Sequence, residues 1–442
     1  MKTTVAFTLA SLLGLTNLAA SAQTLNTAKL DSLLTSLGTN NKMMGSLAIS
    51  HEGKVVYSHA FGSAQLAPPM LATPATHYRV GSISKMFTAV MVMQLIDEKK
   101  LTLSTPLASF FPELPNAKTI TIDQLLSHRS GLHNFTSDAA YEGYMTQPKT
   151  HAELLAIMAQ NKADFEPGAK YAYSNSNYVL LSYIVEQLTK LSYAKALQKR
   201  VLAKAHLQDT YYGGKIGLRK EEALSYEGSA NGWKLSPETD MSIPAGAGAV
   251  VSTPADLDRF LEALFGGKLV SAASLAQMQT MRDGYGLGLE SAHFRTKKSY
   301  GHGGAIDGFR SLASYFPADK LAVALCTNGH NYPLNDAMLG VLRIYFNEPY
   351  KIPNFIPYVP TLADLERGVG TYASPQLPFK VTFTKEGNTF NTQATGQSAI
   401  LLEPVSPGVF TFDPDGIRVE FDPAKAAFTL KQGGREYLFT KE

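Results

Sequence analysis

The chain has 442 residues, of which 45% are hydrophobic and 17% charged, and 40 basic against 37 acidic residues give it a formal net charge of +3. This length exceeds one compact unit, so two or three are expected. Because the two signs of charge are mixed without long runs, the composition argues against a nucleic-acid partner.

The N-terminus has the three parts of a secretory signal peptide. Lys2 supplies the positive start, residues 5–20 an apolar run, and residues 20–22 an Ala-Ser-Ala cleavage site. Polar residues interrupt the apolar run, which is too short for a stable membrane span. We therefore predict that residues 1–22 are a signal peptide and that the protein is exported, either to the periplasm or outside the cell.

The first predicted elements of the mature chain are a helix, a hairpin and a second, apolar helix. Leucines recur at helical spacing over residues 26–37, and two strand-like runs, 46–50 and 55–61, flank a Glu-Gly turn. Residues 82–98 are apolar on nearly every face of a helix. A helix of that kind is buried in the centre of a protein.

Residues 99 to about 240 alternate short helical patterns with Pro, Gly and Asn, which predicts a mostly helical insertion. Strand patterns return at 309–316 and 321–327, the second of which contains the single cysteine, Cys326, which we expect to be buried. A helix over 338–346 follows. Strands at both ends with helices between them indicate one α/β domain over residues 23–350.

The pattern of residue types in the sequence changes near residue 350. Residues 351–360 form a proline-rich linker. Short alternating segments follow, separated by glycine-containing turns, and they predict an antiparallel β module over 361–442, either a small barrel or a sandwich. The predicted strands are 379–384, 389–394, 399–402, 409–412, 418–421, 427–430 and 436–440. We find no catalytic group of residues in this module.

Three short motifs carry the chemistry: Ser82-Ile-Ser-Lys85, Tyr173-Ser-Asn175 and His302-Gly-Gly304. A serine at a helix start benefits from the backbone N–H groups there, and a lysine three residues later lies over the same face. Burial of Lys85 in an apolar helix should lower its pKa and yield a neutral amine. Acyl transfer through a serine ester needs such a nucleophile and base.

The other two motifs supply accessory groups. The Tyr173 hydroxyl can relay a proton, and the Asn175 amide can orient the lysine or a substrate carbonyl. The glycines after His302, which we place just before the strand from residue 309, allow close approach of a backbone or a substrate. Two similar patterns compete. Ser192–Lys195 lies on a solvated helix, and Tyr345–Asn347 is more simply the end of a helix.

The order of these motifs resembles the serine β-lactamase-like superfamily, which includes class C β-lactamases, D-Ala-D-Ala peptidases, esterases and D-aminopeptidases. Similarity extends over residues 25–347 through five segments: 78–85, 125–132, 165–175, 246–256 and 301–304. The resemblance implies an antiparallel sheet flanked by helices, and residues 361–442 are weakly similar to a lipocalin-type barrel.

The resemblance also implies roles for individual residues. Ser82 would be acylated, and Lys85 and Tyr173 would share its proton, with either as the base. Asn175 would orient Lys85 and bind the acyl side of the substrate. The substrate would bind along His302, Gly303, Gly304 and Ala305, with the N–H groups of Ser82 and Ala305 forming the oxyanion hole. Neither a metal nor an organic cofactor is implied.

One departure from the family pattern concerns the substrate. Penicillin-directed members carry Lys-Thr-Gly where this chain has His302-Gly-Gly304. The sequence thus loses a permanent charge and a hydroxyl that help to hold the carboxylate of the drug. We therefore expect an exported serine hydrolase that cleaves esters or D-amino-acid amides and peptides. Two alternatives stay open: a β-lactamase, and a non-catalytic penicillin-binding or sensor protein that keeps the fold. The oligomeric state is undetermined.

Overall fold

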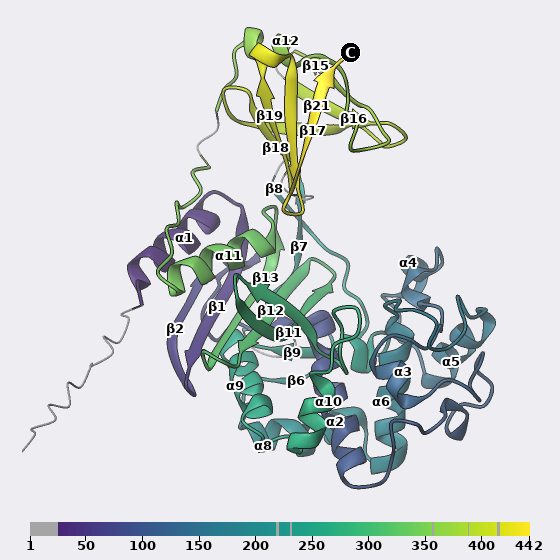
Figure 1. Cartoon of the computed structure of the whole chain (residues 1–442). Coiled ribbons are helices and arrows are strands. Elements are labelled where there is room, and N and C mark those ends of the chain that lie inside the picture. The colour runs from purple at the N-terminus through teal and green to yellow at the C-terminus, as the bar shows by residue number, and fades with distance from the viewer. Residues whose placement is uncertain (1–24, 218–220, 230–231, 356–357, 388, 413–415) are drawn as a thin grey trace, which may run out of the picture.

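The computed structural model describes residues 25–217, 221–229, 232–355, 358–387, 389–412 and 416–442. The predicted signal peptide, residues 1–22, lies outside the described residues. Figure 1 shows a unit of helices and sheet with a small β-barrel beside it, connected by the chain that runs from α11 to α12.

A large sheet forms the framework of the first unit. Its strands follow the order β10-β11-β12-β13-β1-β2, and the hairpin β7–β8 joins it because β7 pairs with β13. Strand β1 pairs with β13 in antiparallel orientation. Strands from the beginning and the end of this unit are therefore neighbours inside the sheet. The strands are β1 (Met43–His51), β2 (Lys54–Phe61), β7 (Tyr226–Ser229), β8 (Gly232–Leu235), β10 (Glu290–Phe294), β11 (Lys297–Ile306), β12 (Phe309–Phe316) and β13 (Leu321–His330).

Both predicted hairpins of this unit, β1–β2 and β12–β13, are confirmed. One other prediction was wrong. The motif His302–Gly304 does not precede a strand but lies inside β11, where Gly303 pairs with Leu312. The insertion predicted to be mostly helical also contributes β7 and β8 to the sheet. In both cases pairing with a neighbouring strand supplies the backbone hydrogen bonds. The local pattern of a glycine-rich sequence does not predict such pairing.

Helices cover both faces of the sheet. On one face α1 (Thr27–Thr39) and α11 (Leu334–Tyr345) share an apolar cluster with β1 and β13. On the other face α9 (Pro254–Phe265) contacts β1, β12 and β13. The remaining helices are α3 (Ile122–Leu126), α4 (Tyr141–Tyr144), α5 (His151–Gln160), α6 (Asn175–Thr189), α7 (Tyr193–Leu197), α8 (Ala203–Ala205) and α10 (Ala272–Met278). Short strands complete the unit: β3 (Ser63–Leu66), β4 (Pro69–Leu71), β5 (Tyr78–Arg79), β6 (Tyr211–Tyr212) and β9 (Val250–Ser252).

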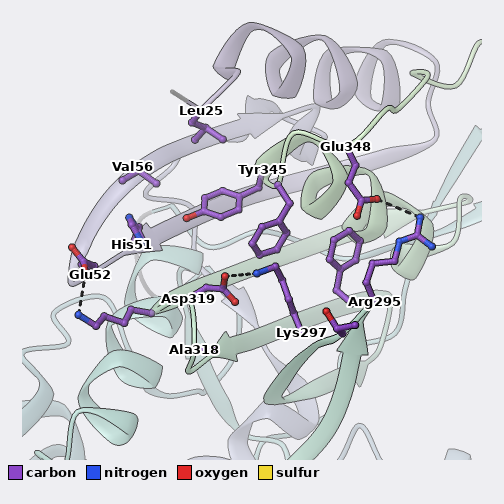
Figure 2. A pocket seen from close by; sticks show the side chains of 14 residues that line it. Leu25, His51, Glu52, Val56, Arg295, Lys297, Ala318, Asp319, Tyr345 and Glu348 are labelled. Carbon is purple, nitrogen blue, oxygen red and sulfur yellow. Dashed lines mark hydrogen bonds and ion pairs between the residues drawn. The ribbon is translucent and has the colours of Figure 1, made fainter. Parts of the chain in front are cut away.

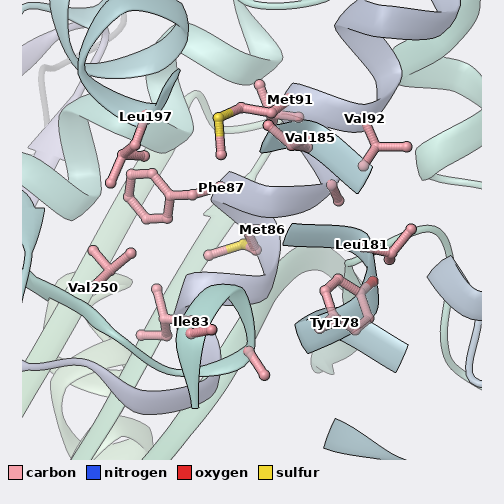
Figure 3. Packing of buried hydrophobic residues seen from close by; sticks show 14 of the residues in the cluster. Ile83, Met86, Phe87, Met91, Val92, Tyr178, Leu181, Val185, Leu197 and Val250 are labelled. Atoms are coloured by element: carbon pink, nitrogen blue, oxygen red, sulfur yellow. The ribbon is translucent and has the colours of Figure 1, made fainter. Parts of the chain in front are cut away.

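Helix α2 (Ser84–Asp97) occupies the centre of the largest core, as its apolar sequence predicted. Every residue from 84 to 95 is buried. Figure 3 shows α2 side chains such as Phe87 packed among residues of other elements, including Val250 and Leu197. The Phe87 ring stacks on Phe260 of α9 with centroids 4.0 Å apart. A short 3₁₀ turn, Gly81–Ile83, precedes the helix and carries Ser82.

The C-terminal module is a closed barrel of eight antiparallel strands, preceded by α12 (Leu362–Gly368). All seven predicted strands are present. The eighth, β14 (Gly370–Ala373), closes the barrel by pairing with both β15 and β21. Its sequence, Gly-Thr-Tyr-Ala, has one large apolar residue, which is too few to show an alternating pattern. The others are β15 (Val381–Glu386), β16 (Thr389–Ala394), β17 (Ile400–Ser406), β18 (Val409–Phe412), β19 (Ile417–Asp422), β20 (Ala427–Gln432) and β21 (Arg435–Lys441). Aromatic rings fill its interior.

Replacement of Phe87 by alanine tests the importance of the α2–α9 contact. Because Phe87 is fully buried and stacked, we expect the free energy of unfolding to fall by about 3–5 kcal/mol. Urea titration followed by the fluorescence of Trp233, the single tryptophan, reports on this unit. The control Leu71→Ala, at a side chain that is 75% exposed, should change it by less than about 0.5 kcal/mol. Equal effects of the two variants would contradict this account of the core.

Candidate active site

A cavity of about 740 Å³ opens beside Ser82. Both polar and apolar residues from the insertion, the β7–β8 hairpin and β11 line it. They are Ser82, Thr136, Tyr141, Glu142, Met145, Thr146, Asn175, Glu227, Lys234, Pro237, Thr239, Pro244, Ala247, Gly248, Ala305, Ile306, Asp307 and Arg310. Of the residues singled out in the sequence, Ser82, Asn175 and Ala305 thus face the same space.

A second, larger cavity of about 950 Å³ lies near the β1–β2 turn and the end of α11 (Figure 2). Its charged side chains neutralise one another in ion pairs that join Arg295 to Glu348, Lys297 to Asp319 and Lys320 to Glu52. None of the three motifs that carry the proposed chemistry contributes to its walls, although Tyr345 and Phe346 of the competing Tyr-Phe-Asn pattern do. We therefore place the candidate active site at Ser82.

The amine of Lys85 is held in a fixed position beside Ser82. Its Nζ lies 2.9 Å from Ser82 Oγ, 2.8 Å from Asn175 Oδ1 and 2.9 Å from the carbonyl oxygen of Ala247. Complete burial of the side chain lowers the pKa of Lys85 well below its usual range. A neutral amine has two N–H groups, enough for the two carbonyl acceptors. Its lone pair then remains for the hydroxyl proton of Ser82.

Tyr173 also lies beside the serine hydroxyl. The two side chains are hydrogen-bonded, and the Tyr173 ring centroid is 4.8 Å from Lys85 Nζ. Burial raises the pKa of Tyr173 above its ordinary value, so the side chain stays a neutral phenol. A phenol of this kind can donate a proton while accepting another, but it is a poor source of phenolate base.

The Asn175 amide is oriented by a loop of the insertion. Its Nδ2 donates to Thr136 Oγ1 at 3.0 Å, which directs Oδ1 toward Lys85. Its backbone N–H donates to Asn134 Oδ1 at 2.9 Å. Asn175 is also the first residue of helix α6. The carbonyl acceptor for Lys85 is therefore fixed from both its backbone and its side chain.

Sequence reasoning missed two groups that support this arrangement. The Ala247 carbonyl sits in a turn that packs tightly on α2, because Gly246 O accepts a hydrogen bond from Thr88 Oγ1 at 2.7 Å. His128 Nδ1 accepts from the backbone N–H of Ser174 at 3.1 Å, and its ring lies 4.2 Å from the Tyr173 ring. The segments 246–256 and 125–132 had drawn attention through family resemblance, but nothing local in them indicated these contacts.

The serine turn and β11 approach each other at backbone distance. A Cβ on Gly304 would lie 2.0 Å from Val80 O, and one on Gly81, whose φ is +50°, would lie 2.7 Å from Ala305 N. Gly303 N donates to the Glu290 carboxylate, on the β10 side of β11. Alternate residues of a strand direct their N–H groups to the same side, so Ala305 N points that way too. Strand β10 does not reach Ala305, because the two strands are antiparallel and the first residue of β10, Glu290, pairs with Gly301. This N–H is thus available beside Ser82.

The other residues of the His302 motif are placed differently from what their predicted role suggests. The His302 ring is buried, with Nε2 3.1 Å from the Tyr285 hydroxyl, and it does not line the cavity. Burial lowers the pKa of His302, which favours the neutral ring. Glycine is required at position 304 because the backbone there lies too close to the Val80 carbonyl for a Cβ. A Cβ on Gly303 would meet Leu312 at an ordinary 3.5 Å, so its glycine has no comparable steric requirement.

The two competing motifs have structural roles. Ser192 caps α7, accepting a hydrogen bond from Lys195 N, and the Lys195 backbone rather than its amine makes this contact. Helix α11 ends at Tyr345, which is the first residue of the competing Tyr-Phe-Asn pattern. Cys326 is buried, as expected.

Neither a membrane-spanning helix nor a metal-binding cluster is found in the part of the chain that the structure describes. No helix there is both long and apolar enough to cross a bilayer. No group of three or more His, Cys, Asp or Glu side chains in the same ranges could hold a metal ion.

Comparison of the sequence with known proteins identifies relatives across the first unit. The model of the Beta-lactamase family matches residues 30–343. The putative penicillin-binding protein PbpX of Bacillus subtilis is 29% identical over 70% of this chain and 75% of its own. Teichoic acid D-alanine hydrolase of Staphylococcus aureus is 26% identical over 52% of this chain, and the match spans 57% of that protein.

Solved structures extend the comparison. D-amino acid amidase from Ochrobactrum anthropi superposes with a TM-score of 0.66 at 26% identity, over 73% of this chain and 98% of that one. The octameric penicillin-binding protein homologue from Pyrococcus abyssi, at 24% identity, shares the fold over 94% of this chain and all of its own, with a TM-score of 0.69. With the family match spanning most of the chain, this protein belongs to the beta-lactamase family and is a serine hydrolase.

Proposed function

We propose that the protein is an exported hydrolase that cleaves amides or esters of D-amino acids through an acyl-enzyme on Ser82. The observation that carries this proposal is the position of Lys85, whose Nζ lies 2.9 Å from Ser82 Oγ while two carbonyl oxygens occupy its other contacts. This arrangement provides a general base for a serine hydroxyl without a histidine.

In the acylation step, Ser82 Oγ attacks the substrate carbonyl carbon and its proton passes to Lys85 Nζ. The carbonyl oxygen becomes an oxyanion, which the N–H groups of Ser82 and Ala305 stabilise. Tyr173 then donates its hydroxyl proton to the leaving nitrogen or oxygen and is reprotonated from Lys85. The bond to the leaving group breaks, and the acyl group remains as an ester of Ser82.

Deacylation uses the same groups in reverse. Water attacks the ester carbonyl and gives its proton to the Lys85–Tyr173 pair, and Ser82 Oγ leaves as the hydroxyl. The buried, neutral state of both proton carriers suits this exchange, because neither has to hold a charge permanently.

The relatives support a D-aminoacyl substrate, the state of His302 argues against a β-lactam, and the N-terminal sequence supports export. D-amino acid amidase and teichoic acid D-alanine hydrolase, both named for D-amino acid chemistry, are among the relatives. The buried, neutral His302 provides no fixed cation for the carboxylate of a β-lactam. The signal-peptide pattern of residues 1–22 supports export.

Ser82→Ala should abolish acyl transfer. We expect no labelling by a fluorophosphonate and no ester turnover, because the attacking oxygen is removed while the fold stays intact. Intact-protein mass spectrometry and circular dichroism measure the two effects. The matched control is Ser192→Ala, which removes the serine of the competing motif. It should keep its activity and lose about 1 kcal/mol of stability as a helix cap. Labelling of the Ser82 variant, or inactivity of the Ser192 variant, would mean that the nucleophile has been misassigned.

Lys85→Arg should lower the acylation rate by about 10²–10⁴-fold, because a guanidinium stays protonated and cannot accept the serine proton. The lowered pKa of Lys85 also has a consequence for the native enzyme: acylation should persist well below the pH at which an ordinary lysine becomes protonated, and it should fall at lower pH as acid protonates the amine. Stopped-flow measurement of the acylation burst against pH tests both. Lys85→Met keeps the side chain neutral and controls for folding. Acylation by the arginine variant at the native rate would remove Lys85 from the role of base.

The substrate class is tested by comparing D- and L-alanine p-nitroanilides, a D-alanyl ester and nitrocefin on the native protein and Ser82→Ala. We expect Ser82-dependent hydrolysis of the D-alanyl compounds, at least about tenfold faster than of the L-amide, and little turnover of nitrocefin. Fast nitrocefin turnover would favour the β-lactamase alternative. Stoichiometric labelling of Ser82 without turnover of any substrate would favour the non-catalytic penicillin-binding alternative.

A further inference from the structure

Glu290, the first residue of β10, brings a carboxylate to the open edge of β11. Its Oε2 accepts a hydrogen bond from Gly303 N at 3.2 Å, and its Oε1 lies 3.8 Å from His302 Nε2. The side chain is 46% exposed, so it faces both the strand edge and the solvent. The sequence motifs did not include this residue.

Its negative charge is not neutralised by a fixed cation. Among the described residues, no lysine or arginine lies within ion-pair distance of Glu290. The one basic side chain at that distance is His302. Burial lowers the pKa of His302, which favours the uncharged ring. The charge of Glu290 also acts on Lys85 and Tyr173, so it lies within electrostatic reach of the reacting groups.

The position of Tyr173 indicates which part of a substrate Glu290 faces. The Tyr173 side chain is hydrogen-bonded to Ser82 and would protonate the leaving nitrogen or oxygen of the substrate. Its ring centroid lies 6.4 Å from that of His302, the residue that Glu290 contacts. The cavity beside Ser82, lined by Asn175 and Thr136 and not by Tyr173 or Glu290, can hold the acyl group. A leaving group that departs past Tyr173 therefore passes toward Glu290.

We propose that Glu290 is a specificity residue that disfavours substrates whose leaving group carries a negative charge. The preferred substrates have neutral or cationic leaving groups, such as simple amides, amines and alcohols. Peptides that end in a free D-amino-acid carboxylate are disfavoured. This inference rests on the acyl-enzyme function proposed above. Two like charges a few ångströms apart in a half-exposed site repel each other enough to change kcat/KM by about tenfold.

A pair of D-alanyl esters that differ by one charge tests the inference. D-alanyl glycolamide ester and D-alanyl glycolate ester share the acyl group and the scissile bond, and the second has a carboxylate on its leaving group. The ratio of their kcat/KM values is measured by release of D-alanine. Glu290→Gln keeps an oxygen acceptor for Gly303 N and removes the charge.

We expect Glu290→Gln to raise kcat/KM for the glycolate ester about tenfold and to leave that for the glycolamide ester nearly unchanged. Glu290→Lys should shift the ratio further in the same direction. The control Glu366→Gln, which removes an equal charge from α12 in the C-terminal module, should give the native ratio. An unchanged ratio in Glu290→Gln, or an equal loss for both esters, would overturn the proposal and leave Glu290 with a structural role.

Failure of the proposed substrate class would be recognised separately. If the native protein hydrolyses neither ester, the rates at which a phenyl phosphonate and its m-carboxyphenyl analogue label Ser82 are compared instead. These reagents also differ by one charge on the leaving group. A native preference for the neutral reagent that Glu290→Gln abolishes would still support the role of Glu290, and a preference that persists would contradict it.

Discussion

The candidate site depends on a contact between two stretches of backbone more than 200 residues apart in the sequence. Strand β11 and the turn before α2 touch without any side chain between them, since a Cβ at Gly304 would lie 2.0 Å from Val80 O. Ser311 Oγ adds a hydrogen bond to the same carbonyl at 2.9 Å. Because this contact sets the distance from Ser82 to the Ala305 N–H, any side chain inserted there would separate the two N–H groups of the proposed oxyanion hole.

The same turn leads into the most deeply buried helix of the protein, and this burial has two effects. It anchors Ser82 on a rigid element, which keeps the proposed nucleophile in a constant position relative to its proposed base. It also removes Lys85 from water. That would be strongly unfavourable for an isolated ammonium group, and here it is offset by a lowered pKa and by hydrogen bonds to Asn175 and Ala247. The core that stabilises the fold therefore also makes the amine reactive.

Charge is distributed unevenly around the serine. Lys85, Tyr173 and His302 are all buried in states that favour the neutral form, so the centre of the site has little fixed charge. The Glu290 carboxylate at the edge of β11 is then opposed by few nearby charges. In a partly desolvated site one such group can bias which substrates react, because weak dielectric screening extends its influence over several ångströms.

The sequence by itself determined what local pattern can encode: the buried helix α2, both hairpins, seven strands of the barrel, and the identities of Ser82 and Lys85 as neighbours three residues apart. Asn175 was associated with them through motif order. Only the tertiary structure decided the rest. The place of His302 inside β11, the strand β14 that closes the barrel, the Ala247 carbonyl and the carboxylate of Glu290 all depend on pairing between segments distant in the chain. Helical and strand periodicity report which face of an element is buried, but they do not specify which neighbour buries it.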